Sequence, residues 1–156
     1  LVDKVQTKIF AAQATGCSPV TTAIKNGTEN IIPVKPNTIA KSIAIGNPAD
    51  GYYGIKTANA SGGYGEDISD EEIVSAMKLL AETEGIFTET AGGVTVGVTQ
   101  KLIQQGRIKP DEVTVICITG NGLKTQEALA DCFPAPEVIE PNIKGFEEVF
   151  ANSLTV

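Results

Sequence analysis

Three short segments combine glycine with polar residues in a way that could serve a ligand. They are Ile45-Gly46-Asn47-Pro48, Glu89-Thr90-Ala91-Gly92-Gly93 and Thr119-Gly120-Asn121-Gly122. Glycine lets a backbone approach a flat ligand closely, and a threonine hydroxyl or a glutamate carboxylate beside it can hydrogen-bond that ligand. Each segment also has a purely structural interpretation. Asn47-Pro48 could simply form a turn, Glu89 could place its carboxylate at the positive end of a helix dipole, and 119–122 could be a glycine turn that ends a strand.

The 119–122 turn follows an apolar, β-branched run at 113–119, which is typical of a strand buried on both faces of a parallel sheet. In open α/β sheets, ligands bind outside the carboxyl ends of the strands, so this position suits a ligand-facing loop. The turn has neither the Gly-Lys-Ser/Thr of a Walker loop nor the third glycine of a dinucleotide fingerprint.

Several kinds of chemistry are excluded by composition. The sequence has no histidine, which removes Ser-His and Cys-His nucleophile pairs and histidine-ligated zinc. The three cysteines are widely spaced and form no CxxC pair; they are Cys17, Cys117 and Cys132. We therefore expect no metal site and no disulfide framework. A reducing cytoplasm fits this cysteine usage best. Cys17 is expected to be structural, and Cys117 to be inert inside a core strand.

The acidic cluster lacks the alternating oxygen ligands and the glycine of a calcium loop. A solvated strand end followed by a helix cap explains it, and its members are Glu66, Asp67, Asp70, Glu71 and Glu72.

The chain of 156 residues is 42% hydrophobic and 20% charged, with a net charge of −7. We expect one α/β domain over 1–156, whose last part, 133–156, is a proline-rich acidic tail. Lysines are scattered and Arg107 is the only arginine, so nucleic acid is disfavoured as a partner. No apolar run is long enough for a membrane span, and the N-terminal residues do not resemble a signal peptide. The Leu1 start suggests a chain cut from a longer parent.

Hydrophobic periodicity predicts most of the elements. The clearest is a helix over 70–84, because Ser69 and Glu72 form a capping box and Gly85 suits the C-terminal cap. The segment 31–34 is either a connector or a minor strand, and 38–46 suits either helix or strand, with helical spacing favouring a short helix. The remaining predictions are strands at 8–14, 64–68 and 113–119, and helices at 18–25, 52–60, 92–106, 123–131 and 145–151. This order predicts an α/β class with a mostly parallel sheet flanked by helices.

Four segments together resemble the C-terminal part of the threonine synthases, pyridoxal-phosphate enzymes of the tryptophan-synthase-β-like fold. They are SIAIGNP at 42–48, SDEEIVSAMKLLAETEGIF at 69–87, ETAGGVTVGVTQKLI at 89–103 and VICITGNGLK at 115–124. TGNGLK favours threonine synthases over related dehydratases and cysteine synthases. The resemblance implies the C-terminal part of a fold-type II enzyme that converts O-phosphohomoserine and water to threonine and phosphate.

The resemblance also implies site residues. Thr119 matches the hydroxyl residue beside the pyridine nitrogen of the cofactor, where a neutral hydroxyl can hydrogen-bond that nitrogen without donating a full proton. Ile45, Gly46 and Asn47 match the segment against the cofactor ring, where a side chain at the glycine would collide. Glu89 matches a position near the floor of the active site, although a threonine follows it where family members usually have proline.

The family's Schiff-base lysine and its glycine-rich phosphate loop have no match in these residues. The resemblance therefore implies no catalytic residue in this chain, pyridoxal phosphate in the parent enzyme but no tight binding here, and no activity from this chain alone. Lys124 is interpreted as a surface lysine. The parent is expected to act on a small molecule and to form a homo-oligomer. Two alternatives remain open: a non-catalytic module that binds a small anion, nucleotide or partner protein, and a fragment of a related dehydratase.

Overall fold

The structure is a computed structural model that describes residues 5–132 and 137–151. Strands β1 (Ala11–Ala14) and β2 (Gly65–Ile68) pair in parallel, with Ala11 opposite Gly65 and Ala14 opposite Ile68. The α-helices are α1 (Pro19–Lys25), α2 (Gly51–Ala60), α3 (Asp70–Glu84), α4 (Thr90–Gln104) and α5 (Ile143–Phe150). Three short 3-10 helices complete the described elements: η1 (Lys41–Ile43), η2 (Gly122–Lys124) and η3 (Gln126–Cys132).

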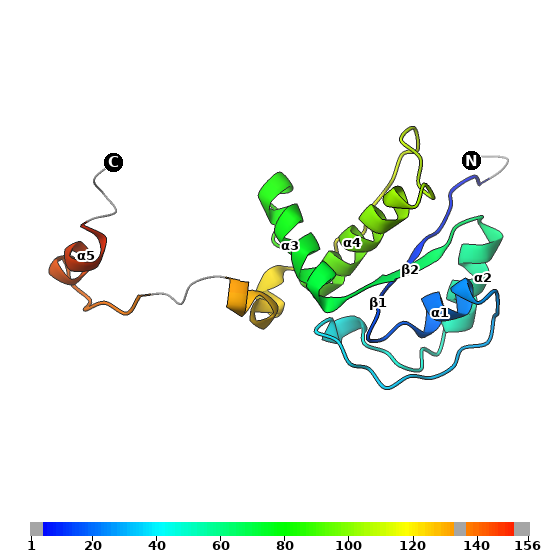
Figure 1. Ribbon diagram of the computed structural model, residues 1–156, viewed down its shortest axis with the longest axis horizontal. Coiled ribbons are helices and arrows are strands. Elements are labelled where there is room, and N and C mark those ends of the chain that lie inside the picture. Colours follow the sequence, from blue (N-terminus) through cyan, green and yellow to red (C-terminus); the bar gives the residue numbers. More distant parts are fainter. Residues whose placement is uncertain (1–4, 133–136, 152–156) are drawn as a thin grey trace.

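Helices cover both faces of the two strands, with α1 and α2 on one face and α3 and α4 on the other (Figure 1). One apolar core lies under α1 and α2 and contains Ile24 and Ile55. The second lies under α3 and α4 and contains Met77 and Val98. This three-layer arrangement confirms the predicted α/β class with a parallel sheet between helices.

Small residues let the layers approach closely. A Cβ added to Gly65 of β2 would lie 2.8 Å from Cδ1 of Ile24 in α1, and one added to Gly97 of α4 would lie 2.5 Å from Cδ1 of Ile68. Both distances are shorter than any ordinary carbon contact. Glycine at these two positions therefore allows the helices to pack directly on β2.

The helix α3 confirms its prediction in detail. The Glu72 amide donates to Oγ of Ser69 (3.3 Å), and Oε2 of Glu72 accepts from the Ser69 amide (2.7 Å), which completes the capping box. Gly85 ends the helix with a φ of 67°, a left-handed conformation that favours glycine. This strong local signal identified the helix without help from tertiary contacts.

The helices α1, α2 and α4 are confirmed with small differences. At the start of α1, Oε1 of Gln13 accepts from the amides of Val20 (2.9 Å) and Thr21 (3.0 Å), whereas Ser18 makes no side-chain cap. The strand β1 thus supplies the cap of the helix that follows it. The helix α4 begins at Thr90, two residues before the expected start, and Ile103 near its end is exposed.

The predicted core strand at 113–119 is wrong. This segment joins no ladder, and the side chains of Val113 and Val115 are 96% and 84% exposed. A strand needs a neighbour to bond its main-chain groups, and no described strand lies alongside this one. Cys117 is exposed, not buried as predicted.

The predicted helix over 38–46 is also wrong, because only η1 forms there. The Ile39 amide donates to Oδ2 of Asp70 (3.1 Å), and the Thr38 hydroxyl donates to the other oxygen of the same carboxylate. These contacts at the start of α3 replace the bonds that a helix would need. Residues 31–34 form a connector without strand structure.

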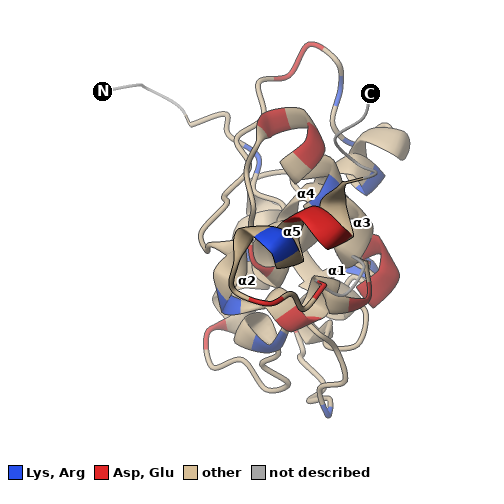
Figure 2. Ribbon diagram, turned by 90° about the vertical axis from the view of Figure 1, so that its left-hand side faces the viewer, with Lys and Arg blue, Asp and Glu red and all other residues tan. Residues whose placement is uncertain are grey.

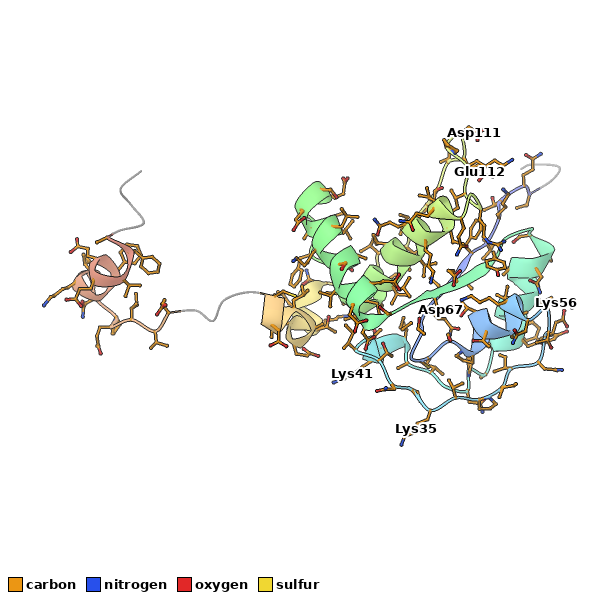
Figure 3. All side chains as sticks on the ribbon, in the orientation of Figure 1. Lys35, Lys41, Lys56, Asp67, Asp111 and Glu112 are labelled. Carbon is orange, nitrogen blue, oxygen red and sulfur yellow. The ribbon has the colours of Figure 1, made fainter. Side chains whose placement is uncertain are left out.

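The acidic cluster is only partly solvated, because Glu66 and Asp67 are buried. Lys25 pairs with both carboxylates, and Gln105 donates to Oε2 of Glu66 (2.7 Å). Burial by itself raises the pKa of Glu66, but the hydrogen bonds from Lys25 and Gln105 outweigh it and lower the pKa to about 2. Figure 3 shows Asp67 between the helices, whereas the labelled lysines lie at the periphery.

The C-terminal part forms α5, close to the predicted final turn, and Oδ1 of Asn142 caps it by accepting from the Gly145 amide (2.8 Å). Figure 1 shows α5 apart from the layered body. Residues 133–136 and 152–156 of the predicted tail lie outside the described residues. Basic and acidic residues are interspersed in the view of Figure 2. No helix in the described ranges has the length and apolar character needed to cross a membrane.

Candidate functional site

The glycine turn at 119–122 pairs with the residues that lead into α4. Thr88 and Asn121 form an antiparallel bridge. The Glu89 amide donates to the carbonyl of Gly120 (3.0 Å), and the Gly122 amide donates to the carbonyl of Phe87 (3.0 Å). Two of the three candidate segments are therefore joined through their backbones.

At two positions of this turn, a residue larger than glycine would collide with a neighbouring side chain unless that side chain moved. A Cβ at Gly120 would lie 1.9 Å from Oε1 of Glu89, and a Cβ at Gly122 would lie 2.6 Å from the ring of Phe87. The side chains of Glu89 and Phe87 thus lie directly over the two glycines. The turn holds its shape against α4 because no side chain intervenes.

Glu89 is the N-cap residue of α4, and it is 7% exposed. Its side chain makes no capping hydrogen bond. The carboxylate lies over Gly120, where a negative charge is also favoured by the dipole of a 15-residue helix. Glu89 can therefore act as a carboxylate at the start of α4 and also lie beside the glycine turn.

The turn lies at the carboxyl end of the sheet. Along α4, Gly97 packs on Ile68 at the end of β2, whereas the Arg107 guanidinium, just past the helix, lies 3.4 Å from the ring centroid of Tyr64, which precedes β2. The helix α4 therefore runs antiparallel to β2, and its N-terminus, with the 119–122 turn, lies beyond the carboxyl end of the strand. Ligands of open α/β folds bind at this end.

Thr119 is exposed at this end, and its side chain makes no hydrogen bond to the described part of the chain. Its hydroxyl is free to act toward a ligand as donor or acceptor.

The third segment, 45–47, lies on a connection anchored at the same end. Asp70, which holds Thr38 and Ile39, directly follows the end of β2, and η1 contacts α4. Ile45 is 57% exposed and Asn47 is exposed. The presence of glycine at position 46 is explained by packing within the protein. The Gly46 carbonyl accepts from the Val34 amide (3.0 Å), and a Cβ at Gly46 would lie 1.9 Å from the Val34 carbonyl oxygen.

Two threonines with no predicted role, Thr88 and Thr125, hold the turn through their hydroxyls. The hydroxyl of Thr88 lies 3.2 Å from the carbonyls of Gly120 and of Glu89, and the hydroxyl of Thr125 accepts from the Thr90 amide (3.3 Å). The Thr90 hydroxyl is buried without a partner in the described chain. Their contacts cross between segments far apart in sequence, so no local pattern could have revealed them.

The two buried hydroxyls give a matched pair of variants. We expect Thr88→Val to destabilise the chain by about 1–2 kcal/mol, because it removes a buried donor from two carbonyls. Thr90→Val keeps the shape of a side chain whose hydroxyl has no partner, so we expect no loss, or a gain of about 1 kcal/mol. Urea unfolding followed by circular dichroism measures both values. Equal losses in the two variants would contradict the assigned contacts.

The family that the sequence resembles carries pyridoxal phosphate, and the site fits part of that cofactor. An exposed, unpaired Thr119 hydroxyl at the carboxyl end of the sheet suits the pyridine nitrogen. No lysine in 5–132 or 137–151 is buried, and Lys8, Lys25, Lys101 and Lys144 are held in ion pairs with acidic residues. The described residues thus offer an exposed hydroxyl and no buried amine.

The model of the family described as pyridoxal-phosphate dependent enzyme matches residues 3–120. The match covers well over half of the chain, so the chain belongs to the pyridoxal-phosphate dependent enzyme family.

Among its relatives are threonine synthases. The chain is 42% identical over 134 residues to the threonine synthase of Methanocaldococcus jannaschii, covering 85% of this chain and 33% of the relative. It is 40% identical over 143 residues to that of Methanosarcina acetivorans, covering 90% of this chain and 35% of the relative. The chain thus spans about a third of the length of these relatives. A solved structure of maize serine racemase is similar over 58% of this chain and 27% of its own, with 22% identity and a TM-score of 0.41.

Proposed function

We propose that this chain forms one wall of the cofactor site in a threonine synthase, which converts O-phosphohomoserine and water to threonine and phosphate. The observation that carries the proposal is the exposed Thr119 hydroxyl, which has no hydrogen-bond partner among the described residues. It lies on a turn whose backbone is bonded to the residues leading into α4, at the carboxyl end of a parallel sheet. The similarity to threonine synthases over 85–90% of the chain supports the choice of reaction.

In this proposal, Thr119 hydrogen-bonds the pyridine nitrogen and sets the position of the ring. Ile45, Gly46 and Asn47 lie along the ring, and Glu89 fixes the floor of the site through its position over Gly120. Pyridoxal phosphate, when bound, supplies an electron sink for the chemistry of the amino-acid substrate. The described residues bind and orient, since no lysine in 5–132 or 137–151 is buried where it could anchor the cofactor covalently.

We propose further that the chain alone is inactive because it lacks the lysine that anchors the cofactor, and one labelling experiment tests that lack while an assay of the complete enzyme tests the reaction. The chain is mixed with pyridoxal phosphate, treated with borohydride and analysed by peptide mass spectrometry, and we expect no lysine to carry a stoichiometric pyridoxyl group. Specific labelling of one lysine would overturn the proposed division of roles. In the complete enzyme, O-phosphohomoserine should release phosphate, and failure to do so would overturn the proposed reaction.

Thr119→Val and Thr119→Ser in the complete enzyme test the role of the hydroxyl. The valine variant should lose about tenfold or more in kcat, and the serine variant should retain most of it, because only serine keeps a hydrogen bond to the ring nitrogen. The absorption maximum of the bound cofactor should shift in the valine variant alone. Unchanged kcat and spectrum in the valine variant would contradict the assignment.

We also propose that the chain self-associates, because exposed apolar side chains such as those of Val113 and Val115 favour association. A cytoplasmic location is proposed from the unpaired, widely spaced cysteines.

A further inference from the structure

The sequence contains two Asn-Gly pairs, Asn26-Gly27 and Asn121-Gly122. In such a pair the main-chain nitrogen of the glycine can attack Cγ of the asparagine side chain, because glycine has no side chain to obstruct the approach. A C–N bond forms, the side-chain nitrogen leaves as ammonia, and a five-membered succinimide results. Water then opens the ring at either carbonyl and leaves aspartate or isoaspartate. The reaction needs no reagent other than water, so the fold determines which pair reacts.

The attack requires a glycine amide that is free to move. In an ordered segment the amide must first leave its hydrogen-bond acceptor, and the asparagine must rotate about its Cα–C bond until the amide faces the side chain. The free energy of this local opening therefore sets how fast an Asn-Gly pair reacts in a folded chain.

The pair in the 119–122 turn is held by contacts on several sides. Oδ1 of Asn121 accepts from the Leu123 amide (2.9 Å), and the Gly122 amide donates to the carbonyl of Phe87 (3.0 Å). Gly122 is buried, and a Cβ there would lie 2.6 Å from the Phe87 ring. Freeing this amide would also disturb the bridge between Thr88 and Asn121. The turn must therefore separate from the residues leading into α4 before Asn121 can react.

The pair at the end of α1 is held only by local contacts. Asn26 is the C-cap residue of α1, it is exposed, and its side chain makes no hydrogen bond to the described part of the chain. Gly27 is also exposed, with a φ of 65° and no atom within 4 Å of an added Cβ. The Gly27 amide donates to the Ile24 carbonyl (3.0 Å), and the Thr28 amide donates to the Ala23 carbonyl (3.0 Å). Both bonds lie at the end of a helix of seven residues, and such ends open at little free-energy cost.

We propose that Asn26 is a site of spontaneous deamidation in the folded chain, whereas the contacts of the 119–122 turn protect Asn121. The same dipeptide occurs at both places, so the difference in reactivity arises from the contacts around each pair and not from the local sequence. The glycine turn stays chemically intact while the end of α1 is modified.

The modification acts on the end of α1 that carries Lys25. Deamidation of Asn26 replaces a neutral amide with a carboxylate at the negative end of the helix dipole, where a negative charge is unfavourable. The isoaspartate product also lengthens the main chain by a methylene group. Lys25, the adjacent residue, pairs with the buried carboxylates of Glu66 and Asp67. A new carboxylate beside Lys25 competes for its ammonium group, so deamidation should weaken the link between α1 and β2.

The reaction rates of the two pairs test the proposal. The chain is incubated at mildly alkaline pH, peptide mass spectrometry follows the conversion of each asparagine, and a protein-isoaspartate methyltransferase marks the isoaspartate product. In the folded chain, Asn26 should convert at least about tenfold faster than Asn121. In urea the two rates should agree within about threefold, because each asparagine is followed by glycine. Equal rates in the folded chain, or a faster rate at Asn121, would overturn the proposal.

Two variants distinguish local opening from global unfolding. Thr88→Val removes a hydroxyl that lies 3.2 Å from the Gly120 carbonyl in the protected turn, so it should raise the rate at Asn121 alone. Asn26→Gln has a longer side chain that does not close the five-membered ring, so it should remove the signal at residue 26 and leave Asn121 unchanged. If Thr88→Val accelerated both pairs equally, the reaction would proceed through global unfolding, and the assignment to the exposed end of α1 would be wrong.

The effect on stability has its own matched pair of variants. Asn26→Asp carries the charge of the product, and Asn30→Asp places the same charge at an exposed residue outside the helix. Asn26→Asp should lower the midpoint of urea unfolding more than Asn30→Asp does, and high salt should narrow the difference because it screens the added charge. Equal midpoints would reject the predicted effect on α1. None of these measurements depends on the proposed function.

Discussion

Replacing Lys25 by methionine should destabilise the folded chain by about 3 kcal/mol at pH 7. Lys25 pairs with the carboxylates of both Glu66 and Asp67, and Glu66 is 5% exposed. Without Lys25, Glu66 retains the hydrogen bond from Gln105 and a longer contact of 3.8 Å to Nζ of Lys101. A buried carboxylate without its main partner is costly because water cannot replace the lost interaction.

Two variants serve as controls for Lys25→Met. Lys78→Met removes an exposed lysine of α3 for which the described chain shows no ion pair, and it should change stability by less than about 0.5 kcal/mol. The double variant Lys25→Met/Glu66→Gln should regain much of the loss, because the amide carries no charge to be left unpaired. Urea unfolding of all four chains measures the effect, and equal losses in the two lysine variants would contradict it.

The same cluster predicts the acid sensitivity of the chain. The pKa of Glu66 is lowered from 4.5 to about 2 in the folded state. A lowered carboxyl pKa stabilises the folded state above pH 4.5, and this contribution, about 3 kcal/mol, is lost as the pH falls from 4.5 to 2. The difference in unfolding free energy between the wild-type chain and Glu66→Gln should therefore shrink over that range. A constant difference would show that Glu66 does not carry the acid sensitivity.

Gly46→Ala should destabilise the chain by about 2 kcal/mol even when no cofactor is present. The added Cβ would lie 1.9 Å from the carbonyl oxygen of Val34 and 3.1 Å from its carbonyl carbon. Both are backbone atoms, so no side-chain rotation can relieve the contact, and the hydrogen bond between the Val34 amide and the Gly46 carbonyl would be strained or lost.

A second glycine provides the control for Gly46→Ala. Gly54 lies within α2, and the nearest atom to an added Cβ there is 4.0 Å away. Gly54→Ala should therefore stabilise the chain by about 0.5–1 kcal/mol, because alanine loses less backbone entropy in a helix. Thermal unfolding of the two variants should shift in opposite directions. An unchanged melting temperature for Gly46→Ala would show that the fold does not require glycine at this position.

Elements with strong local signals were predicted correctly from the sequence. The capping box of Ser69 and Glu72 and the left-handed Gly85 define α3 through contacts within a few residues. Local contacts of this kind form whatever surrounds the helix, so the printed sequence was sufficient. The importance of Thr119 and Glu89 was inferred from the order of the motifs, and the pairing of their two segments was found only in the structure.

The order of residues by itself determined the α/β class, the long helices and the family resemblance, because periodicity and caps act over one or two turns. Only the tertiary structure decided the rest: the burial of Glu66 and Asp67, the threonines that hold the glycine turn, and the fate of 113–119. An apolar, β-branched run becomes a strand only where another strand bonds its backbone, and an acidic pair becomes buried only where lysines from other elements reach it. Both outcomes depend on partners distant in sequence, so the local sequence wrongly predicted a core strand at 113–119 and a solvated acidic cluster.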